Sequence, residues 1–156
     1  MLSKRPSESV VYKTDVVCPN DTNPMGILQG GRLVEWMDMA AAVCAQTHAA
    51  KICVTASINQ VDFYTAAKVG EIITITARIT RSFNSSMEIF VLAFAKNVLA
   101  GKKQLISEAY FNFVALDEFG KASPVIAVRP ITQTDKDFFN EALLRRRKII
   151  RRKIKK

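Results

Sequence analysis

One carboxylate stands in an apolar run, where it could do acid–base chemistry. Asp38 lies in GGRLVEWMDMAAAVCA, residues 30–45, which predicts a helix buried on every side. No residue three or four positions from Asp38 is basic, so the helix itself offers it no ion pair. A charge in such a place is costly unless it is paired or used. Two interpretations remain open. Asp38 lies at an exposed shoulder of the helix, or it is a general base or nucleophile in a water-poor cleft, where desolvation makes a carboxylate more basic.

The glycine pair that begins this helix could bind an oxygen anion. Gly30 and Gly31 let a ligand approach the backbone closely. The free amides and the positive end of the helix dipole suit an oxyanion or a phosphate at this point. Asn23, in the preceding loop, could orient a water or a carbonyl. Ordinary turn formation explains the same residues, and that alternative stays open.

The spacing of these groups points to a site shared by two subunits. Asp38 lies seven residues after Gly31, which is roughly 10 Å along a helix. One small reacting carbonyl cannot easily touch both positions. A site that combines the helix start of one subunit with Asp38 of its partner removes the difficulty, so we expect composite sites at a dimer interface.

The elements that must position these residues are one helix and a set of strands. Residues 10–17 have the character of a strand, and the helix runs from Gly30 to about Ala50, rich in alanine. Four more segments predict strands from their β-branched content and alternation. They are 54–64, 71–80, 87–98 and 104–116, with turns at FNSS and AGKK.

This order predicts an α+β fold. Short links make the later strands mostly antiparallel, and one apolar helix and one antiparallel sheet can bury only each other. We therefore expect a long central helix wrapped by a curved antiparallel β-sheet. Such a sheet leaves long edge strands, which are usually paired by dimerisation.

Composition narrows the class of protein. The chain has 156 residues, 49% hydrophobic and 24% charged, as expected of a soluble globular domain. Its three cysteines form no CxxC pair, which predicts reduced thiols and a cytoplasmic location. The chain has a single histidine, His48, which rules out a histidine-rich metal centre. We interpret His48 as an ordinary residue near the C-terminal end of the helix. We expect no metal, no signal peptide and no transmembrane segment.

The positive charge is concentrated at the C-terminus. The net charge is +9, and residues 145–156, RRRKIIRRKIKK, hold nine Lys or Arg, which leaves the rest formally neutral. In FFNEALLRRRKIIRRKIKK, Phe139, Leu143, Ile150 and Ile154 share one helical face, interrupted by Arg147. A basic amphipathic helix can contact an anionic membrane or phosphate groups. The alternative is a solvated helix that packs on a neighbouring subunit.

Four stretches of the chain resemble the acyl-CoA thioesterases of the hotdog fold, and among them the cytosolic acyl-CoA hydrolases. They are NDTNPMGILQGGRLVEWMDMAAAVCAQTHA, VTASINQVDFYTAAKVGE, SFNSSMEIFVLAFAKN and FNFVALDEFGKASPV, within about residues 10–130. The family fold, a long helix wrapped by a curved antiparallel sheet, agrees with the fold predicted above. We divide the chain into a hotdog domain, 1–130, and a basic C-terminal segment, 131–156.

The resemblance implies hydrolysis of fatty acyl-CoA to free fatty acid and CoA. The catalytic pair that it implies is Asp38 with Asn23, from different subunits, while the Gly31 amide would polarise the thioester carbonyl. Asp38 would activate water or attack the carbonyl directly, and both routes remain open. The residues expected to contact the substrate are Gly30, Gln29, Ser57, Ser85, Ser86 and Met87.

Two positions depart from the family pattern. Gln29 stands where the family commonly has an aromatic residue, and Thr47 stands where it often has an arginine. Both could alter the preference for the acyl chain or for CoA. The resemblance also implies a homo-oligomer, at least a dimer and by preference a hexamer of three dimers. No cofactor is expected, and nucleic acid is not an expected partner.

Two other functions compete with hydrolysis. The segment DTNPMG is similar to the Asp-x-Asn-Pro-x-His pattern of hotdog hydratases, but Gly26 fills the histidine position and removes half of that catalytic pair. A non-catalytic acyl-CoA sensor on the same fold is the second alternative. Release of free thiol from an acyl-CoA would separate an enzyme from a sensor.

Overall fold

Five antiparallel strands form the sheet that carries the rest of the molecule. The structure is a computed structural model, and it describes residues 2–156. The strand order is β2-β4-β5-β6-β3, and every neighbouring pair is antiparallel. The strands are β2 (Val11–Val16), β3 (Ile52–Phe63), β4 (Ile72–Ser82), β5 (Ser86–Asn97) and β6 (Lys102–Leu116). β3 and β2 are therefore the two edges.

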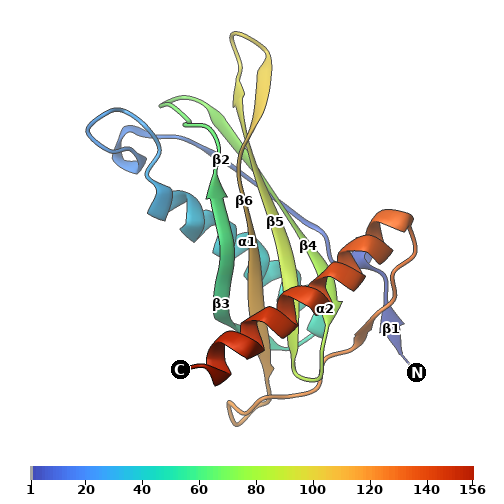
Figure 1. Cartoon of the computed structure of the whole chain (residues 1–156). Helices are drawn as coiled ribbons and strands as arrows, with labels where there is room; N and C mark the ends of the chain where they lie inside the picture. The colour runs from blue at the N-terminus through green and yellow to red at the C-terminus, as the bar shows by residue number, and fades with distance from the viewer. Residues whose placement is uncertain (1) are drawn as a thin grey trace.

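The long helix α1 (Gly30–Ala49) lies against one face of this sheet, as Figure 1 shows. The apolar residues of β4 alternate as the sequence predicts: Ile73, Ile75, Ala77 and Ile79 are at most 1% exposed and face the helix side. The helix ends where Ala50 adopts a left-handed conformation, φ 52°. The predicted α+β architecture, a long helix wrapped by an antiparallel sheet, is confirmed.

One side of α1 is open, so the prediction of a helix buried on every side is wrong for the single chain. Met39 and Val43 are each 50% exposed, and Glu35 on the same stripe is exposed as well. Asp38 borders this stripe and is half-buried. The reason is geometric: a helix packed on one sheet covers one stripe and leaves the opposite one free. An apolar stripe left open on a helix is typical of a surface that a partner covers.

A second helix, α2 (Gln133–Ile154), crosses the opposite face of the sheet (Figure 1). Its first turn is capped by Thr132, whose hydroxyl accepts from the Asp135 amide at 3.0 Å. Phe138 packs on Phe90 of β5, with ring centroids 4.9 Å apart, and Ala142 is fully buried. The helix therefore packs on its own sheet.

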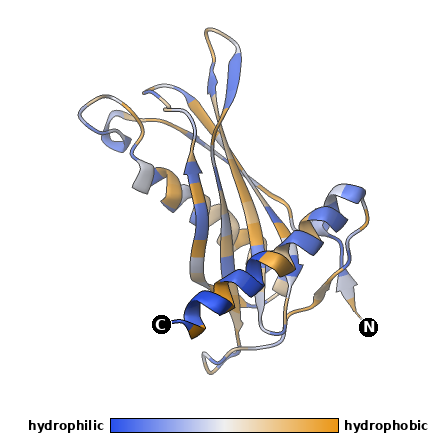
Figure 2. Ribbon diagram, viewed as in Figure 1, coloured by the Kyte–Doolittle hydropathy of each residue, from blue (hydrophilic) through white to orange (hydrophobic). Residues whose placement is uncertain are grey.

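The apolar face expected on this helix is only partly correct. Phe139 packs against the core, but Ile150 and Ile154 are 44% and 79% exposed. The buried face turns through Phe138, Phe139 and Ala142 instead. Phe138 packs on Phe90 of β5, and the Arg81 guanidinium of β4 lies over the Phe139 ring, 3.9 Å from its centroid. Figure 2 shows the last turns of α2 as mostly hydrophilic, with a few hydrophobic segments between the basic ones.

An ion pair joins α2 to the sheet. Glu88 of β5 is 2% exposed, and its carboxylate accepts hydrogen bonds from Arg145 Nε and Nη2, at 3.0 and 2.8 Å to the nearest oxygens. Thr80 Oγ1 donates to the same carboxylate at 2.7 Å. The Arg145 guanidinium also lies over the Tyr110 ring, 3.9 Å from its centroid. Arg145, the first basic residue of the C-terminal run, therefore helps to hold α2 on the sheet.

Two short strands that the sequence analysis missed tie the N-terminus to the later chain. β1 (Ser3–Lys4) pairs in parallel with β7 (Ala127–Val128). Lys4 Nζ donates to the carbonyls of Thr47 and His48 at the C-terminus of α1, at 3.0 and 3.1 Å. Short 3-10 turns lie at Pro6–Glu8 and Pro19–Asp21. In residues 2–156, neither helix is long and apolar enough to cross a membrane.

Candidate active site

The Asp38 carboxylate is held by a hydroxyl from the edge strand. Thr55 of β3 donates its Oγ1 hydrogen to Asp38 Oδ1 at 2.7 Å. No ion pair to Asp38 is present among residues 2–156. One oxygen is therefore fixed by a neutral donor while the charge of the carboxylate stays uncompensated. This is the arrangement that a general base or nucleophile needs, because an ion pair would weaken its basicity.

Asn23 shapes its own loop and keeps a donor free. Its Oδ1 accepts from the amides of Met25 at 3.0 Å and Ile27 at 3.3 Å, an Asx-type turn. The turn interpretation is thus correct for the oxygen. Within the described chain, no hydrogen bond engages the other side-chain atom, Nδ2. The half-buried amide can donate to a carbonyl oxygen of a ligand.

The start of α1 is open to a ligand. Gln29 is the N-cap residue but makes no side-chain cap, since its Nε2 donates to the Thr22 carbonyl instead. The first helical amides, which include that of Gly31, are therefore not capped by this side chain. A Cβ built on Gly31 would meet nothing within 4 Å. The position thus has room for an oxyanion beside the positive end of the helix dipole.

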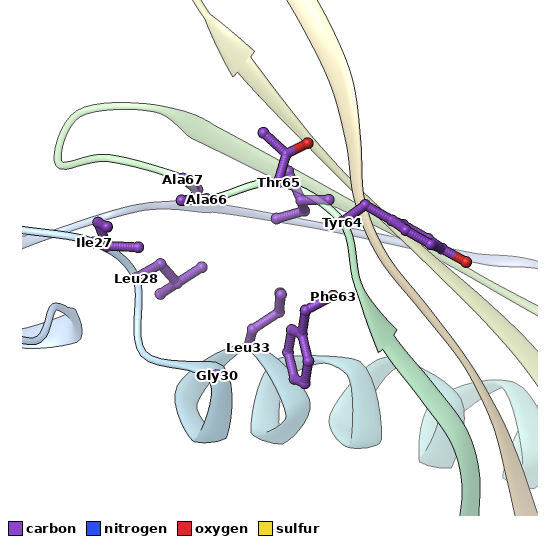
Figure 3. A pocket seen from close by; sticks show the side chains of 10 residues that line it. Ile27, Leu28, Gly30, Leu33, Phe63, Tyr64, Thr65, Ala66 and Ala67 are labelled. Atoms are coloured by element: carbon purple, nitrogen blue, oxygen red, sulfur yellow. The ribbon is translucent and has the colours of Figure 1, made fainter.

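An apolar pocket of about 310 Å³ lies beside the helix start, as Figure 3 shows. Its walls come from the loop before α1, from α1 itself, from the end of β3 and the segment after it, and from β6. They include Leu28, Gly30, Leu33, Phe63, Ala67 and Ile106. A Cβ on Gly30 would lie 3.4 Å from the Phe63 ring, so this glycine makes room for the aromatic wall. Apolar walls of this kind suit a hydrocarbon chain.

The other predicted contact residues lie on the far part of the sheet. Ser57 of β3 is half-buried and accepts from Asn112 Nδ2 at 3.3 Å. Ser85 lies in the turn before β5, and Ser86 is 6% exposed at the beginning of that strand. Met87 is fully buried in the core. The structure thus separates these serines from the pocket beside Gly30.

Three other titratable side chains, two on α1 and one just after β3, are poorly suited to act as a base or nucleophile. Burial raises the pKa of the Cys44 thiol to about 12. His48 is fully buried, its Nε2 lies 3.0 Å from the Ile126 carbonyl, and burial lowers its pKa below the usual range. The hydrogen bond from Tyr64 to Glu108 raises the pKa of Tyr64 to about 12, and Figure 3 shows this ring pointing away from the helix start. Asp38, held by a neutral hydroxyl and without an ion pair among residues 2–156, is the stronger candidate.

The candidate groups do not converge within one chain. Neither Asp38 nor Asn23 lines the pocket beside Gly30. Asp38 instead borders the exposed stripe of α1 that contains Met39 and Val43. A second subunit on this stripe is the simplest way to bring the groups together.

Comparison with known proteins identifies the family. Residues 25–101, which include the helix start, Asp38 and Thr55, match the model of the Thioesterase superfamily. The chain is 36% identical over 138 residues to the uncharacterized acyl-CoA thioester hydrolase YkhA of Bacillus subtilis, and the match covers 88% of this chain and 80% of that protein. The chain belongs to the thioesterase superfamily. This hotdog thioesterase is also 35% identical over 128 residues to the mouse cytosolic acyl coenzyme A thioester hydrolase. That match covers 81% of this chain but only 34% of the mouse protein, which is longer.

Solved structures agree with this assignment. A hexameric acyl-CoA thioesterase, solved in its apo form, has a TM-score of 0.94 with this thioesterase at 35% identity, over 97% of both chains. The acyl-CoA hydrolase from Staphylococcus aureus, solved with butyryl coenzyme A, coenzyme A and coenzyme A disulfide, has a TM-score of 0.91 at 36% identity. That match covers 99% of this chain and 94% of the other.

Three variants of the Staphylococcus aureus enzyme mark residue types that also occur here. In those variants an aspartate, an asparagine or a threonine is replaced by alanine. The aspartate lies 15 residues after the asparagine and 17 before the threonine. Asn23, Asp38 and Thr55 have the same separations in this thioesterase.

Thr55 is the candidate site residue that the sequence analysis missed. It lies 17 residues from Asp38 and in a different element, so no helical or strand spacing relates them. Threonine is also an ordinary residue in a strand, which hides a functional hydroxyl. Only the packing of β3 along α1 places the two side chains in contact.

Proposed function

We propose that this protein is an acyl-CoA thioesterase that hydrolyses fatty acyl-CoA to a free fatty acid and CoA. The observation that carries the proposal is the hydrogen bond from Thr55 to Asp38, at the separation found in a related acyl-CoA hydrolase. The apolar pocket beside Gly30 supports an acyl substrate. Release of free thiol from a panel of acyl-CoAs tests the proposal. Binding of acyl-CoA without thiol release would favour a sensor instead.

In the proposed reaction, Asp38 either activates a water molecule or attacks the thioester carbonyl directly. Either the carboxylate takes a proton from a water that attacks the thioester carbon, or it attacks that carbon itself to give a mixed anhydride that water then opens. Thr55 holds Oδ1, and among residues 2–156 no hydrogen bond or ion pair engages Oδ2, which leaves the second oxygen free to act. Negative charge that develops on the carbonyl oxygen is stabilised by the Gly31 amide and by Asn23 Nδ2. The carbon–sulfur bond then breaks, and CoA leaves as a thiolate.

The site is proposed to combine two subunits in a homo-oligomer. Asp38 and Gly31 are too far apart along one helix to serve one carbonyl, roughly 10 Å, and Asp38 borders an open apolar stripe. We therefore assign Asn23 and Asp38 of each site to different chains. A hexamer of three dimers in the cytoplasm is the assembly and location that we propose, which a hexameric thioesterase and a cytosolic hydrolase among the related proteins support.

Subunit mixing provides a direct test of this shared site. Co-expression of Asn23→Ala and Asp38→Ala chains with different tags should restore activity, because one site of each mixed dimer receives both intact residues. Random pairing within a hexamer should recover about a quarter of wild-type activity per subunit, and an isolated mixed dimer about half. Measured thiol release from the doubly purified oligomer gives the answer. Two inactive variants that stay inactive when mixed would place both residues in one chain.

Thr55 should matter through its hydroxyl rather than through its shape. The isosteric change Thr55→Val removes the donor to Asp38 Oδ1 and should lower kcat about 10- to 100-fold, since a hydrogen bond to a charged group contributes roughly 1.5–3 kcal/mol. Thr55→Ser keeps the donor and should retain most of the activity. Steady-state kinetics on one acyl-CoA compares the three proteins. Equal losses in both variants would show that packing, not hydrogen bonding, is what Thr55 provides.

A further inference from the structure

A second pocket lies on the opposite face of the sheet, under the C-terminal half of α2. It is small, about 80 Å³, and is formed where α2 passes over β3, β5 and β6. From the sheet it is lined by Asn59, Gln60, Glu88 and Tyr110. From the helix it is lined by Arg145, Lys148, Ile149 and Arg152. None of these residues takes part in the proposed hydrolysis.

The pocket carries an unbalanced positive charge. Arg145 is neutralised by Glu88, which it contacts through two hydrogen-bonding nitrogens. Lys148 and Arg152 have no acidic partner within 4.0 Å among residues 2–156. These two side chains are four residues apart on one helix, so they project over the same opening. The pocket thus presents two free cations to a small ligand.

The strand that forms the other wall is distorted at this point. Gln60 has φ 52°, in the left-handed region that a residue with a side chain rarely adopts. The pairing of β3 with β6 shifts register between Asn59 and Asp62. Backbone of this kind costs energy and is concentrated at ligand sites. The exposed Gln60 amide makes no hydrogen bond within the described residues, so it adds a neutral donor.

We propose that this pocket binds a phosphate monoester. Such a group carries about −1.5 to −2 charges at pH 7, which matches the two free cations Lys148 and Arg152, and its oxygens accept from the Gln60 amide. The pocket is too small for a whole nucleotide, so only the phosphate group enters it. The phosphate comes either from the nucleotide end of the CoA substrate or from a free nucleotide.

The position of the pocket permits the first source. Asn59 lies four residues beyond Thr55 on β3, roughly 13 Å along the strand, a distance that the extended pantetheine arm of CoA can span. In that case the inference rests on the proposed function, and the pocket provides affinity for the CoA end of the substrate. In the second case the pocket is independent of hydrolysis.

The test uses two double variants of the full-length protein. Lys148→Met with Arg152→Met removes both pocket cations. Arg147→Met with Arg151→Met is the matched control: it removes the same charge, at the same spacing, from exposed residues of the same helix that do not line the pocket. Calorimetric titration with adenosine 3′,5′-bisphosphate should show a Kd about tenfold higher or more in the pocket variant and little change in the control. Equal weakening in both, or in neither, would overturn the inference.

Kinetics with two substrates then separates the sources of the phosphate. If the substrate supplies it, the pocket variant should raise KM for butyryl-CoA but not for butyryl-dephospho-CoA, which lacks the 3′-phosphate. If a free nucleotide supplies it, KM for both substrates should be unchanged while binding of the bisphosphate is lost. A protein that binds the bisphosphate but releases no thiol would refute hydrolysis alone. A protein that hydrolyses acyl-CoA but does not bind the bisphosphate would refute the pocket alone.

Discussion

Replacing Asp38 by asparagine is expected to lower kcat for acyl-CoA hydrolysis by roughly 10²- to 10⁴-fold, the usual contribution of a positioned general base. The amide has the shape of the carboxylate and can still accept from Thr55 Oγ1. It cannot take a proton from water or form a mixed anhydride. Thiol release at saturating substrate measures the loss, and calorimetry with CoA should show a Kd within about threefold of wild type, because the substitution leaves the fold and the pockets unchanged.

Glu35 provides the matched control for this experiment. It is an exposed carboxylate one turn earlier on α1, paired with Arg32 at 3.1 Å. Glu35→Gln makes the same chemical change on the same helix and should leave kcat within about twofold of wild type, because exposed ion pairs contribute little. A similar loss of kcat in both variants would show that removing any negative charge from α1 lowers the activity. An Asp38→Asn enzyme with nearly normal kcat would contradict the mechanism.

The largest loss of stability is expected from Glu88→Gln. This change removes the charge that balances Arg145 while preserving side-chain volume at a position 2% exposed. Breaking a buried ion pair on one side costs about 3–5 kcal/mol, because the remaining charge is left without its partner. For a chain of this size, that lowers Tm by roughly 6–20 °C. Urea denaturation at one fixed protein concentration measures the change, since oligomers gain apparent stability with concentration.

A second carboxylate that pairs with Arg145 tests whether burial causes the loss of stability expected from Glu88→Gln. Glu141 lies 3.6 Å from Arg145, but its side chain is 60% exposed. Glu141→Gln should therefore cost less than about 1 kcal/mol. The pair Glu88→Leu with Arg145→Met should recover much of the stability lost in Glu88→Gln, because an apolar replacement of both partners removes the uncompensated charge. Equal effects of Glu88→Gln and Glu141→Gln would contradict a buried anchor for α2.

The residues best predicted from sequence were those whose role depends on local spacing. The alternation of Ile73, Ile75, Ala77 and Ile79 is enough to identify a half-buried strand, because side chains alternate along every strand. The glycine pair and alanine-rich run placed the start of α1 correctly. Asp38 stood out because its helical neighbours offer no basic partner, and that too is a local property.

What sequence could not predict depends on contacts between distant residues. Thr55 meets Asp38 from another element, and Arg145, expected in a solvated basic tail, meets Glu88 across 57 residues. The same tertiary contacts decide which face of α2 is buried, against the apolar pattern of its last turns.

The sequence by itself therefore determined the α+β class, the central helix, the candidate carboxylate and the resemblance to thioesterases. Only the tertiary structure decided that α1 keeps one apolar stripe open beside Asp38, that a threonine holds this carboxylate, and that two cations of α2 remain free over a pocket. The physical reason is that periodicity reports which side of one element is apolar. The partner of a side chain is set by how whole elements pack, and a short pattern carries no information about that packing.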